Sequence, residues 1–242
     1  MPKIITEDMI EQAAIKALHE RHDYDVLNCM TEEPDTLPDG TGRKDKKQVV
    51  LPDVMFESLC RINPDIPEQT VRTVVDELCR TPVSGDLMLT NYHNYQKIRN
   101  GITVEYNKNG KKTSNILRLL SYNDALSNDA LSNTFTVASQ MWIKGETHWR
   151  RPDLIIFING FPMVFIELKN SNISVKNAYD INLKNYLKDI PYLFNYNQIC
   201  VLSNGMETRL GSFAAGYEFF FEWLKVENEK ENPDRKAIRE NC

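Results

Sequence analysis

The sequence lacks the features that would place it in a membrane, in an oxidising compartment or around a zinc ion. No stretch approaches the roughly 18 consecutive apolar residues of a membrane-spanning helix, and residues 1–7 turn acidic without the apolar region of a signal peptide. The five cysteines are scattered and form no Cys-x-x-Cys pair, and no two histidines have i,i+4 spacing. We therefore expect a cytoplasmic protein with reduced thiols, no membrane segment and no zinc site or disulfide framework.

Positive charge is in short supply, because 29 lysines and arginines face 34 aspartates and glutamates, for a formal net charge of −5. This balance argues against a strongly electropositive DNA-binding protein that acts alone. It is compatible with a nuclease, whose acidic metal ligands and surface glutamates both lower the sum. It suggests that most affinity for nucleic acid lies on another domain or subunit. Hydrophobic residues make up 41% of the 242 residues, enough for one large domain or two small ones.

The most informative stretch covers residues 150–170. Two nearly continuous apolar runs flank Asn159-Gly160, a strong signal for a hairpin whose strands are buried on both faces. Three charged residues, Asp153, Glu167 and Lys169, interrupt these runs. Because a buried charge costs several kcal/mol unless it is paired or binds a metal, we expect the three side chains to gather at the open end of the hairpin.

These three side chains suit one kind of chemistry. Two carboxylates can hold a divalent cation such as magnesium, with water and a phosphate oxygen completing its shell. Lys169 follows Glu167 by two residues and therefore points to the same side of the strand. There it can position a water molecule or stabilise the charge that builds on a phosphate. A structural ion-pair cluster of Asp153 with Lys169 is the alternative.

The register of the hairpin decides whether both carboxylates can share a metal. A two-residue loop at Asn159-Gly160 would place Asp153 opposite Ile166, and Glu167 would then face the other side of the sheet. We therefore predict either a three-residue turn with Gly160 at the positive-φ bulge position, or a bulge later in the second strand. Side chains of Asp153 and Glu167 on opposite faces would exclude a shared metal.

The rest of the chain alternates helical and extended patterns, which is an α/β order. Helices are predicted over residues 6–21, 54–63, 67–80 and 175–188, and strands over 24–27, 102–106, 116–122, 134–143 and 199–202. Residues 123–132 repeat Asn-Asp-Ala-Leu-Ser and are expected as a loop with helical turns, and residues 216–225 are aromatic and amphipathic. Residues 30–47 are expected as an exposed loop, whose basic side chains could instead touch phosphate: Arg43, Lys44, Lys46 and Lys47.

Pro-Asp at a strand start, an Asn-Gly hairpin and Glu-x-Lys at the end of the second strand together resemble the PD-(D/E)xK nucleases. The resemblance becomes more specific with seven pieces that span nearly the whole chain: Ile10-Glu11, Asn133-x-Phe135-x-Val137-x-x-Gln140, Arg151-Pro152-Asp153, Asn159-Gly160-x-Pro162, Glu167-Leu168-Lys169, Leu193-Phe194-x-Tyr196-Asn197 and Ser203-Asn204-Gly205. In this order they look like the N-terminal nuclease domain of the R (restriction, or motor) subunit of type I restriction enzymes. The resemblance implies an α/β fold with a restriction-endonuclease-like core, in which a mixed central β-sheet is flanked by helices, and an N-terminal helical part.

The same resemblance implies a magnesium-dependent endonuclease, a type I site-specific deoxyribonuclease, that hydrolyses phosphodiester bonds of duplex DNA. By position, Asp153 and Glu167 would bind magnesium, and Lys169 would be the catalytic lysine. Glu11 would be an additional catalytic acid on the first helix, and a flank residue in a solvated salt bridge is the alternative for it.

Four further residues are candidates for DNA binding. The family places a Gln-x-x-x-Tyr motif on the helix after the lysine, where this sequence has Asn182 and Tyr186. Asparagine keeps the amide but is one methylene shorter than glutamine, so it reaches less far toward DNA or the site. Tyr186 can also be read as an ordinary core tyrosine. Arg150 and Arg151 could clamp backbone phosphates or cap the hairpin against solvent.

Members of this family act within a larger enzyme that contains an ATP-driven DNA translocase and methylation and specificity subunits. This chain has no Gly-x-x-x-x-Gly-Lys-Ser/Thr, so ATP would serve only a motor region beyond Cys242. We expect a nuclease domain over residues 1–225, with its core at about 100–215 plus the first helix, and a charged linker over 226–242. The alternatives are another PD-(D/E)xK nuclease, of DNA repair or junction resolution, and a docking domain with an inactive site.

Overall fold

The computed structural model describes residues 5–80, 85–122 and 133–223. The loop expected over 123–132 and the linker expected over 226–242 lie outside the described residues. Within those three ranges no helix is both long and apolar enough to cross a membrane. The cysteines found there are free thiols: Cys29, Cys60, Cys79 and Cys200.

A seven-stranded sheet forms the centre of the fold, in the order β1-β4-β7-β8-β9-β10-β11. The pairs β1–β4 and β8–β9 are parallel, and the other neighbours are antiparallel. The strands are β1 (Asp25–Asn28), β4 (Phe135–Ser139), β7 (Leu154–Ile158), β8 (Phe161–Leu168), β9 (Ile199–Ser203), β10 (Thr208–Gly211) and β11 (Phe221–Glu222). This mixed sheet with flanking helices confirms the predicted fold class.

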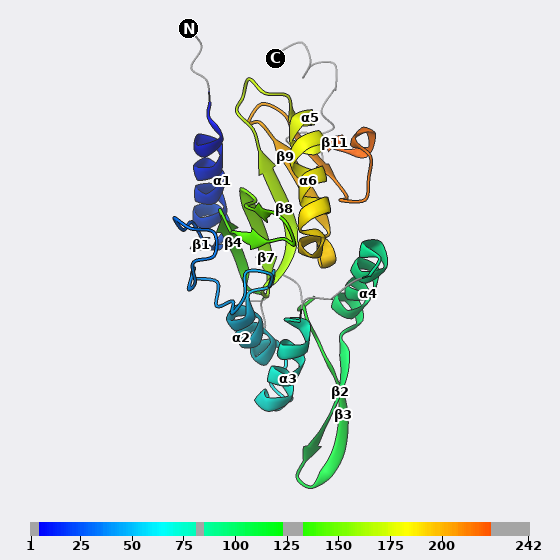
Figure 1. Cartoon of the computed structure of the whole chain (residues 1–242). Helices are drawn as coiled ribbons and strands as arrows, with labels where there is room; N and C mark the ends of the chain where they lie inside the picture. The colour runs from blue at the N-terminus through cyan, green and yellow to red at the C-terminus, as the bar shows by residue number, and fades with distance from the viewer. Residues whose placement is uncertain (1–4, 81–84, 123–132, 224–242) are drawn as a thin grey trace.

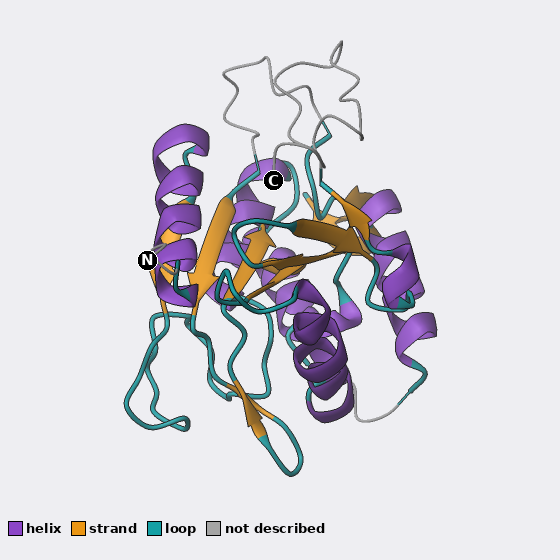
Figure 2. Ribbon diagram, turned by 90° about the horizontal axis from the view of Figure 1, so that it is seen from above, coloured by secondary structure: helices purple, strands orange, loops and turns teal. Residues whose placement is uncertain are grey.

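Helices cover both faces of the sheet (Figures 1 and 2). Helix α1 (Glu7–His22) packs on the face that presents Leu154 and Ile156. The alternate residues Ile155 and Phe157 point to the opposite face and pack with the helical stretch that follows Lys169. Because both faces are buried, β7 has the continuous apolar sequence that is typical of such strands.

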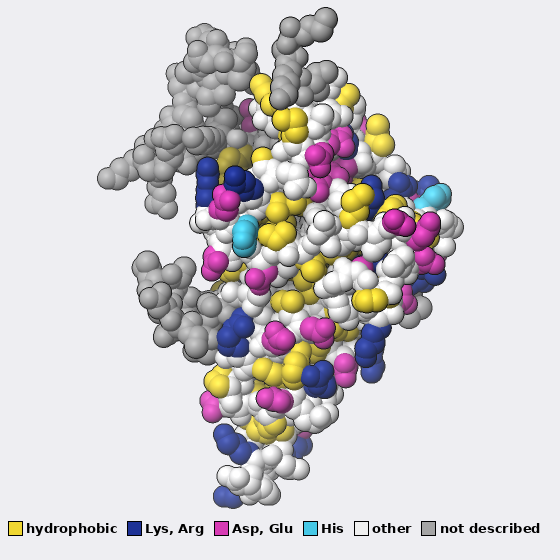
Figure 3. All heavy atoms as spheres, turned by 90° about the vertical axis from the view of Figure 1, so that its left-hand side faces the viewer, with side chains coloured by type: hydrophobic (Ala, Val, Ile, Leu, Met, Phe, Trp, Pro, Cys, Tyr) yellow, Lys and Arg dark blue, Asp and Glu magenta, His cyan; other side chains and the backbone are white. Residues whose placement is uncertain are grey.

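Helix α1 confirms the helix predicted at 6–21. The Thr6 hydroxyl accepts a hydrogen bond from the Met9 amide (3.3 Å), as an N-cap residue does. Asp23 ends the helix in the left-handed conformation, with φ of 57°. Charged side chains of both signs are interspersed with apolar ones over this side of the molecule (Figure 3).

The helix predicted over 175–188 consists of three consecutive segments. These are α5 (Val175–Asn177), a π-helical segment η1 (Ala178–Leu183) and α6 (Lys184–Asp189). The predicted inner residues Leu183 and Tyr186 are buried, and Tyr179 and Leu187 pack beside them. Two short 3-10 segments follow, η2 (Pro191–Asn195) and η3 (Tyr217–Phe219).

Helices α2 (Pro52–Ile62) and α3 (Glu68–Leu78) close the turn end of the β7–β8 hairpin. The Leu51 amide donates to the carbonyl of Gly160 (2.9 Å), which ties α2 to that turn. Both helices match the predicted ones. Helix α4 (Leu87–Asn100) is not anticipated by the sequence analysis.

Helix α4 leads into a separate antiparallel hairpin of β2 (Ile102–Lys108) and β3 (Lys111–Leu117). The strand predicted at 116–122 overlaps β3 only at residues 116–117, because Asn109-Gly110 is a two-residue turn and β3 begins directly after it. The strand predicted at 134–143 divides into β4 and β5 (Ile143–Lys144), and β5 pairs with β6 (Trp149–Arg150).

The expectation of a wholly exposed loop over 30–47 is wrong. Asp39, Arg43 and Lys46 are buried together, with the Asp39 carboxylate 2.6 Å from the Arg43 guanidinium and 2.7 Å from the Lys46 ammonium. Burial alone would raise the pKa of Asp39, but hydrogen bonds from Lys46 and Thr41 and the charge of Arg43 lower it to about 2. Since Arg43 and Lys46 neutralise a buried carboxylate, they are not free to contact phosphate.

Candidate active site

Strands β7 and β8 are joined by a two-residue turn, because Ile158 pairs directly with Phe161. Asn159 and Gly160 both have positive φ, 50° and 81°, as a type I′ turn requires. A Cβ atom on Gly160 would lie 2.6 Å from the carbonyl oxygen of Leu51, so close packing also requires glycine here. The expectation of a three-residue turn is therefore wrong.

The alternative expectation, a bulge in the second strand, is confirmed. The pairs on either side of the irregularity are Ile156 with Val164 and Phe157 with Pro162. Met163 is thus one extra residue in β8, beside a proline, which strands accommodate at bulges. The shift brings Leu154 opposite Ile166, so Asp153 and Glu167 follow as the next opposite pair on one side of the sheet.

Glu167 is buried, with 2% of its surface exposed. Its Oε1 accepts a hydrogen bond from Lys169 Nζ at 3.0 Å, whereas its Oε2 is buried and has no hydrogen-bond partner among the described residues. The Tyr186 hydroxyl is close enough to lower the pKa of Glu167, but it donates its proton to the carbonyl of Arg151. Burial raises the pKa of Glu167 to about 8, the Asp153 charge adds to this effect, and the Lys169 ammonium offsets only part of it. An unbonded buried carboxylate oxygen is an atom that a cation can satisfy.

Asp153 is placed by the backbone of the neighbouring strand. Its Oδ2 accepts a hydrogen bond from the amide of Leu168 at 2.7 Å. Burial nevertheless raises the pKa of Asp153, although this bond and the charge of Lys169 both lower it. Both carboxylates are therefore held at a cost when they are ionised, and Lys169 offsets only part of that cost, which a divalent cation would relieve.

Lys169 lies at the end of β8. Its ammonium group bonds Glu167 and the Leu168 carbonyl (2.7 Å) and lies 3.9 Å from Glu7. Its side chain is 14% exposed, so it reaches the surface beside the carboxylates. The sequence analysis did not identify Glu7, although it lies one helical turn before Glu11 on α1, and this i,i+4 spacing places both on one side of the helix.

Glu11 is buried and joins the site through Gln140. The Gln140 side-chain amide donates to Glu11 Oε2 at 2.5 Å and also hydrogen-bonds to Asp153. Burial raises the pKa of Glu11, and the nearby Asp153 charge raises it further. Gln140 has a left-handed backbone (φ 55°), a conformation that non-glycine residues rarely adopt. The structure thus places Glu11 next to Asp153 rather than in a solvated salt bridge.

Tyr186 belongs both to the core and to the site. Its ring packs on Phe165, with centroids 5.3 Å apart, and its hydroxyl donates to the carbonyl of Arg151 (3.1 Å). Burial raises the pKa of Tyr186, and the nearby charges of Glu167 and Asp153 add to the shift. Asn182 lies in the π-helical segment on the same side and interacts with Tyr186.

The two arginines before Asp153 have different surroundings. The Arg150 guanidinium binds the buried carboxylate of Asp189 at the end of α6, at 2.7 Å from Nε. Arg151 stacks over the ring of Trp142, with 4.8 Å between the guanidinium carbon and the ring centroid, and its charge lowers the pKa of Glu11. Contact of either arginine with DNA stays a prediction.

The residues that the structure describes include no group of three or more His, Cys, Asp or Glu side chains that could together hold a metal ion. A cation at Asp153 and Glu167 would therefore take further ligands from water and substrate, as magnesium commonly does.

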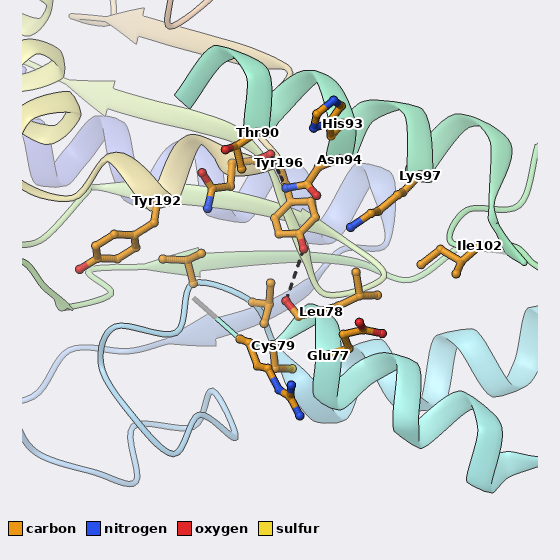
Figure 4. Close-up of a pocket in the computed structure, with 14 residues that line it drawn as sticks. Glu77, Leu78, Cys79, Thr90, His93, Asn94, Lys97, Ile102, Tyr192 and Tyr196 are labelled. Carbon is orange, nitrogen blue, oxygen red and sulfur yellow. Dashed lines mark hydrogen bonds between the residues drawn. The ribbon is translucent and has the colours of Figure 1, made fainter. Parts of the chain in front are cut away.

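A pocket of about 420 Å³ lies elsewhere, between α3, α4 and η2 (Figure 4). Tyr196 crosses it and donates to the Leu78 carbonyl (3.3 Å). None of the candidate site residues lines this pocket, which is thus separate from the carboxylates at the ends of β7 and β8.

Comparison with known proteins agrees with the predicted resemblance. The family model described as "Type I restriction enzyme R protein N terminus" matches residues 4–219. The type I restriction enzyme HindI endonuclease subunit of Haemophilus influenzae is 33% identical over 80% of this chain and 18% of its own length. The putative type I restriction enzyme MjaIXP endonuclease subunit of Methanocaldococcus jannaschii is 30% identical over 94% of this chain and 21% of its own length. This chain spans about a fifth of the length of these relatives, and it belongs to the family of N-terminal regions of type I restriction enzyme R proteins.

Proposed function

We propose that this region is the nuclease of a type I restriction enzyme and that it hydrolyses phosphodiester bonds of duplex DNA with magnesium. One observation carries the proposal: a bulge in β8 sets Asp153 opposite Glu167, and one oxygen of Glu167 is buried without a hydrogen-bond partner in the described part of the chain. In a carboxylate that served only as an ion-pair partner of Lys169, a buried oxygen without a partner would be unusual. Asp153 and Glu167 are the residues that would hold the magnesium ion.

The remaining chemistry is assigned from position. Bound magnesium would supply Lewis acidity toward a phosphate and would lower the pKa of a bound water. The Lys169 ammonium, at the surface beside Glu167, would stabilise the charge that develops on the phosphate. Glu11 would be an additional acidic residue beside Asp153 rather than a third metal ligand, and Gln140 would hold it there.

The substrate and partners follow from family membership. The relatives are named as endonuclease subunits of type I restriction enzymes. We propose that this chain acts on duplex DNA in a complex with methylation and specificity subunits. ATP would serve only a motor region outside the 242 residues. Arg151, Asn182 and Tyr186 surround the carboxylates and are the candidates for contact with the bound DNA.

The test is a calorimetric titration of the 242-residue chain with Mn²⁺, a surrogate for magnesium, with and without a short DNA duplex. We expect one carboxylate-dependent site that is lost in both Asp153→Asn and Glu167→Gln. Glu20→Gln makes the same chemical change as the second variant at an exposed residue of α1 and should bind like the parent. Equal Mn²⁺ affinity in the parent and in both site variants would refute the metal site. Cleavage of a duplex by the assembled enzyme, lost in the same two variants, then tests the reaction.

A further inference from the structure

Positive charge is concentrated in one part of an otherwise acidic chain. Residues 87–122, which comprise α4, β2, β3 and the segment after them, contain a single acidic residue, Glu105. The same stretch contains six basic residues: Lys97, Arg99, Lys108, Lys111, Lys112 and Arg118. The whole chain carries a formal charge of −5. Residues 87–122 are therefore basic, whereas the rest of the chain is more acidic than the net charge of the whole chain indicates.

The β2–β3 hairpin projects from the body of the protein (Figure 1). It is anchored from its base as far as Tyr106, because Val104 and Tyr106 are buried in the cluster around α3 and the Tyr106 hydroxyl donates to the Asp65 carbonyl (3.2 Å). Beyond Tyr106 only the tip of the hairpin is free, and its residues 107–112 are all exposed. Seven residues per strand give the hairpin a length of about 23 Å. Figure 3 shows lysine or arginine side chains at the end of the molecule where this hairpin projects.

The tip of the hairpin carries two lysines whose like charges oppose its folding. Lys108 and Lys111 are direct cross-strand partners next to the Asn109-Gly110 turn, and like charges in that position destabilise a hairpin. Lys112 pairs with Glu105 at 2.7 Å, whereas within the described part of the chain neither Lys108 nor Lys111 has an ion-pair partner. Lysines on an edge strand can discourage aggregation, but that role does not require two of them to face each other. An external polyanion would offset their repulsion.

We propose that the β2–β3 hairpin is an arm that binds the phosphate backbone of duplex DNA. The proposal rests on the proposed function for its partner, since a DNA nuclease is the reason to expect duplex DNA. A two-stranded ribbon is narrow enough to lie in the major groove, and lysine ammonium groups contact phosphates without reading the sequence.

The arm lies at the opposite end of the sheet from the carboxylates. Helices α2 and α3, which hold the base of the hairpin, sit at the Gly160 turn, whereas Asp153 and Glu167 lie at the other end of β7 and β8. The length of β8, eight residues, plus that of the arm amounts to about 50 Å. The arm would therefore hold duplex flanking the cut, about 15 base pairs away on a straight helix, and not the scissile phosphate.

The size of the effect follows from counterion release. Each phosphate that a lysine neutralises contributes about 0.9 to the slope of log affinity against log salt. Removing Lys108 and Lys111 should lower that slope by about 2. Reversing both charges should weaken binding by more than about tenfold at moderate salt, since repulsion then replaces attraction.

The experiment measures the fluorescence anisotropy of a labelled 30-base-pair duplex with the 242-residue chain, in EDTA, over a series of KCl concentrations. The test variant is Lys108→Glu/Lys111→Glu. The matched control is Lys16→Glu/Lys188→Glu, which makes the same change in net charge on exposed parts of α1 and α6. A thermal melt establishes that each variant folds.

The proposal predicts a lower salt slope and an affinity loss of more than tenfold in the arm variant, with less than twofold loss in the control. An equal loss of DNA affinity in the arm variant and in the control would mean that only the net charge matters, which would overturn the proposal. Unchanged DNA binding in the arm variant would also overturn it. A Mn²⁺ titration separates this result from the proposed function: the arm variant should keep the parent's metal affinity, and a parent without metal affinity would refute the nuclease site but not the arm.

Discussion

Replacing Glu167 by glutamine tests whether its carboxylate is held in the fold at an energetic cost that a cation relieves. Burial and the Asp153 charge raise the pKa of Glu167 to about 8, whereas an unfolded glutamate titrates near 4.3. The native state therefore keeps a proton that the unfolded chain has released, and its stability falls as pH rises between these values. At about 1.4 kcal/mol per pH unit, the loss is about 4 kcal/mol between pH 5 and pH 8 without metal.

Glutamine has nearly the same shape but cannot ionise, so Glu167→Gln should remove this slope. In EDTA the variant should become more stable than the parent toward pH 8, with the difference shrinking toward pH 5. Mn²⁺ should restore the parent at pH 8, because a ligand that binds only the native state adds about 2.7 kcal/mol at a hundred times its Kd. It should leave the variant nearly unchanged, since a neutral amide replaces the anionic carboxylate that the cation needs.

The measurement is urea unfolding at pH 5, 6, 7 and 8, in EDTA and in Mn²⁺, followed by tryptophan fluorescence. Glu20→Gln serves as control, because Glu20 is an exposed residue whose only ion-pair partner in the described residues is Lys16 at 3.9 Å, and it should reproduce the slope of the parent. The reasoning fails if Glu167→Gln keeps the pH slope of the parent, or if Mn²⁺ stabilises both proteins equally.

Three further outcomes are expected. Asp39→Asn should destabilise the fold by about 3–5 kcal/mol in urea unfolding, because Arg43 and Lys46 stay buried without their counter-charge; since the pKa of Asp39 is lowered to about 2, the parent should lose this contribution only as pH falls below about 4. Gln140→Ala should weaken Mn²⁺ binding about tenfold in calorimetry, because the Gln140 amide lies between the carboxylates of Glu11 and Asp153. Arg150→Ala should cost about 2 kcal/mol of stability and leave duplex affinity in the anisotropy assay unchanged, because its guanidinium binds a buried aspartate.

The hairpin at the centre of the site could be predicted because it breaks a local rule. Charged residues in a continuous apolar strand must form an ion pair or bind a metal. This rule was enough to single out Asp153, Glu167 and Lys169 from the sequence. The requirement that both carboxylates share a side also predicted a change of register. The choice between turn and bulge was open, and Pro162 was the available signal, since a proline without an N–H group fits a bulge better than a regular strand pair.

Helix α4 could not be predicted in the same way, because it has no apolar stripe. Only Asn94 and Ile98 of this helix are buried. The Asn94 amide donates to the Asn195 carbonyl (3.0 Å), and the Asn91 amide donates to the carbonyls of Phe194 and Asn197 (both 2.8 Å). The helix is thus attached to η2 by polar contacts between residues about a hundred positions apart in sequence, and no local pattern shows them.

The same limit explains the loop over 30–47. Asp39, Arg43 and Lys46 lie in a stretch of charged and turn-forming residues, which is typical of a solvated loop. Arg43 also donates to the carbonyl of Trp142 at 3.1 Å, so the buried ion cluster depends on a segment far along the chain. Charge alone does not tell a buried ion pair from a solvated one when neither residue lies in an apolar run.

Some of these residues could be identified from the sequence and others could not. The difference lies in which part of the chain makes the position of the side chain unfavourable. At Glu167 the cost comes from the residue's own apolar strand and is visible locally. At Lys108 and Lys111 it comes from a cross-strand partner that a two-residue turn fixes, so it becomes visible once the hairpin register is known. Gln140 shows its role only through a strained backbone and contacts to residues of other elements. In each case an unfavourable local arrangement persists in the fold, and for the first two an outside ion or polyanion would relieve it. A titration with Mn²⁺ reports on the first arrangement and DNA binding in EDTA reports on the second, so the two assays, run on the same variants, test the two proposals independently.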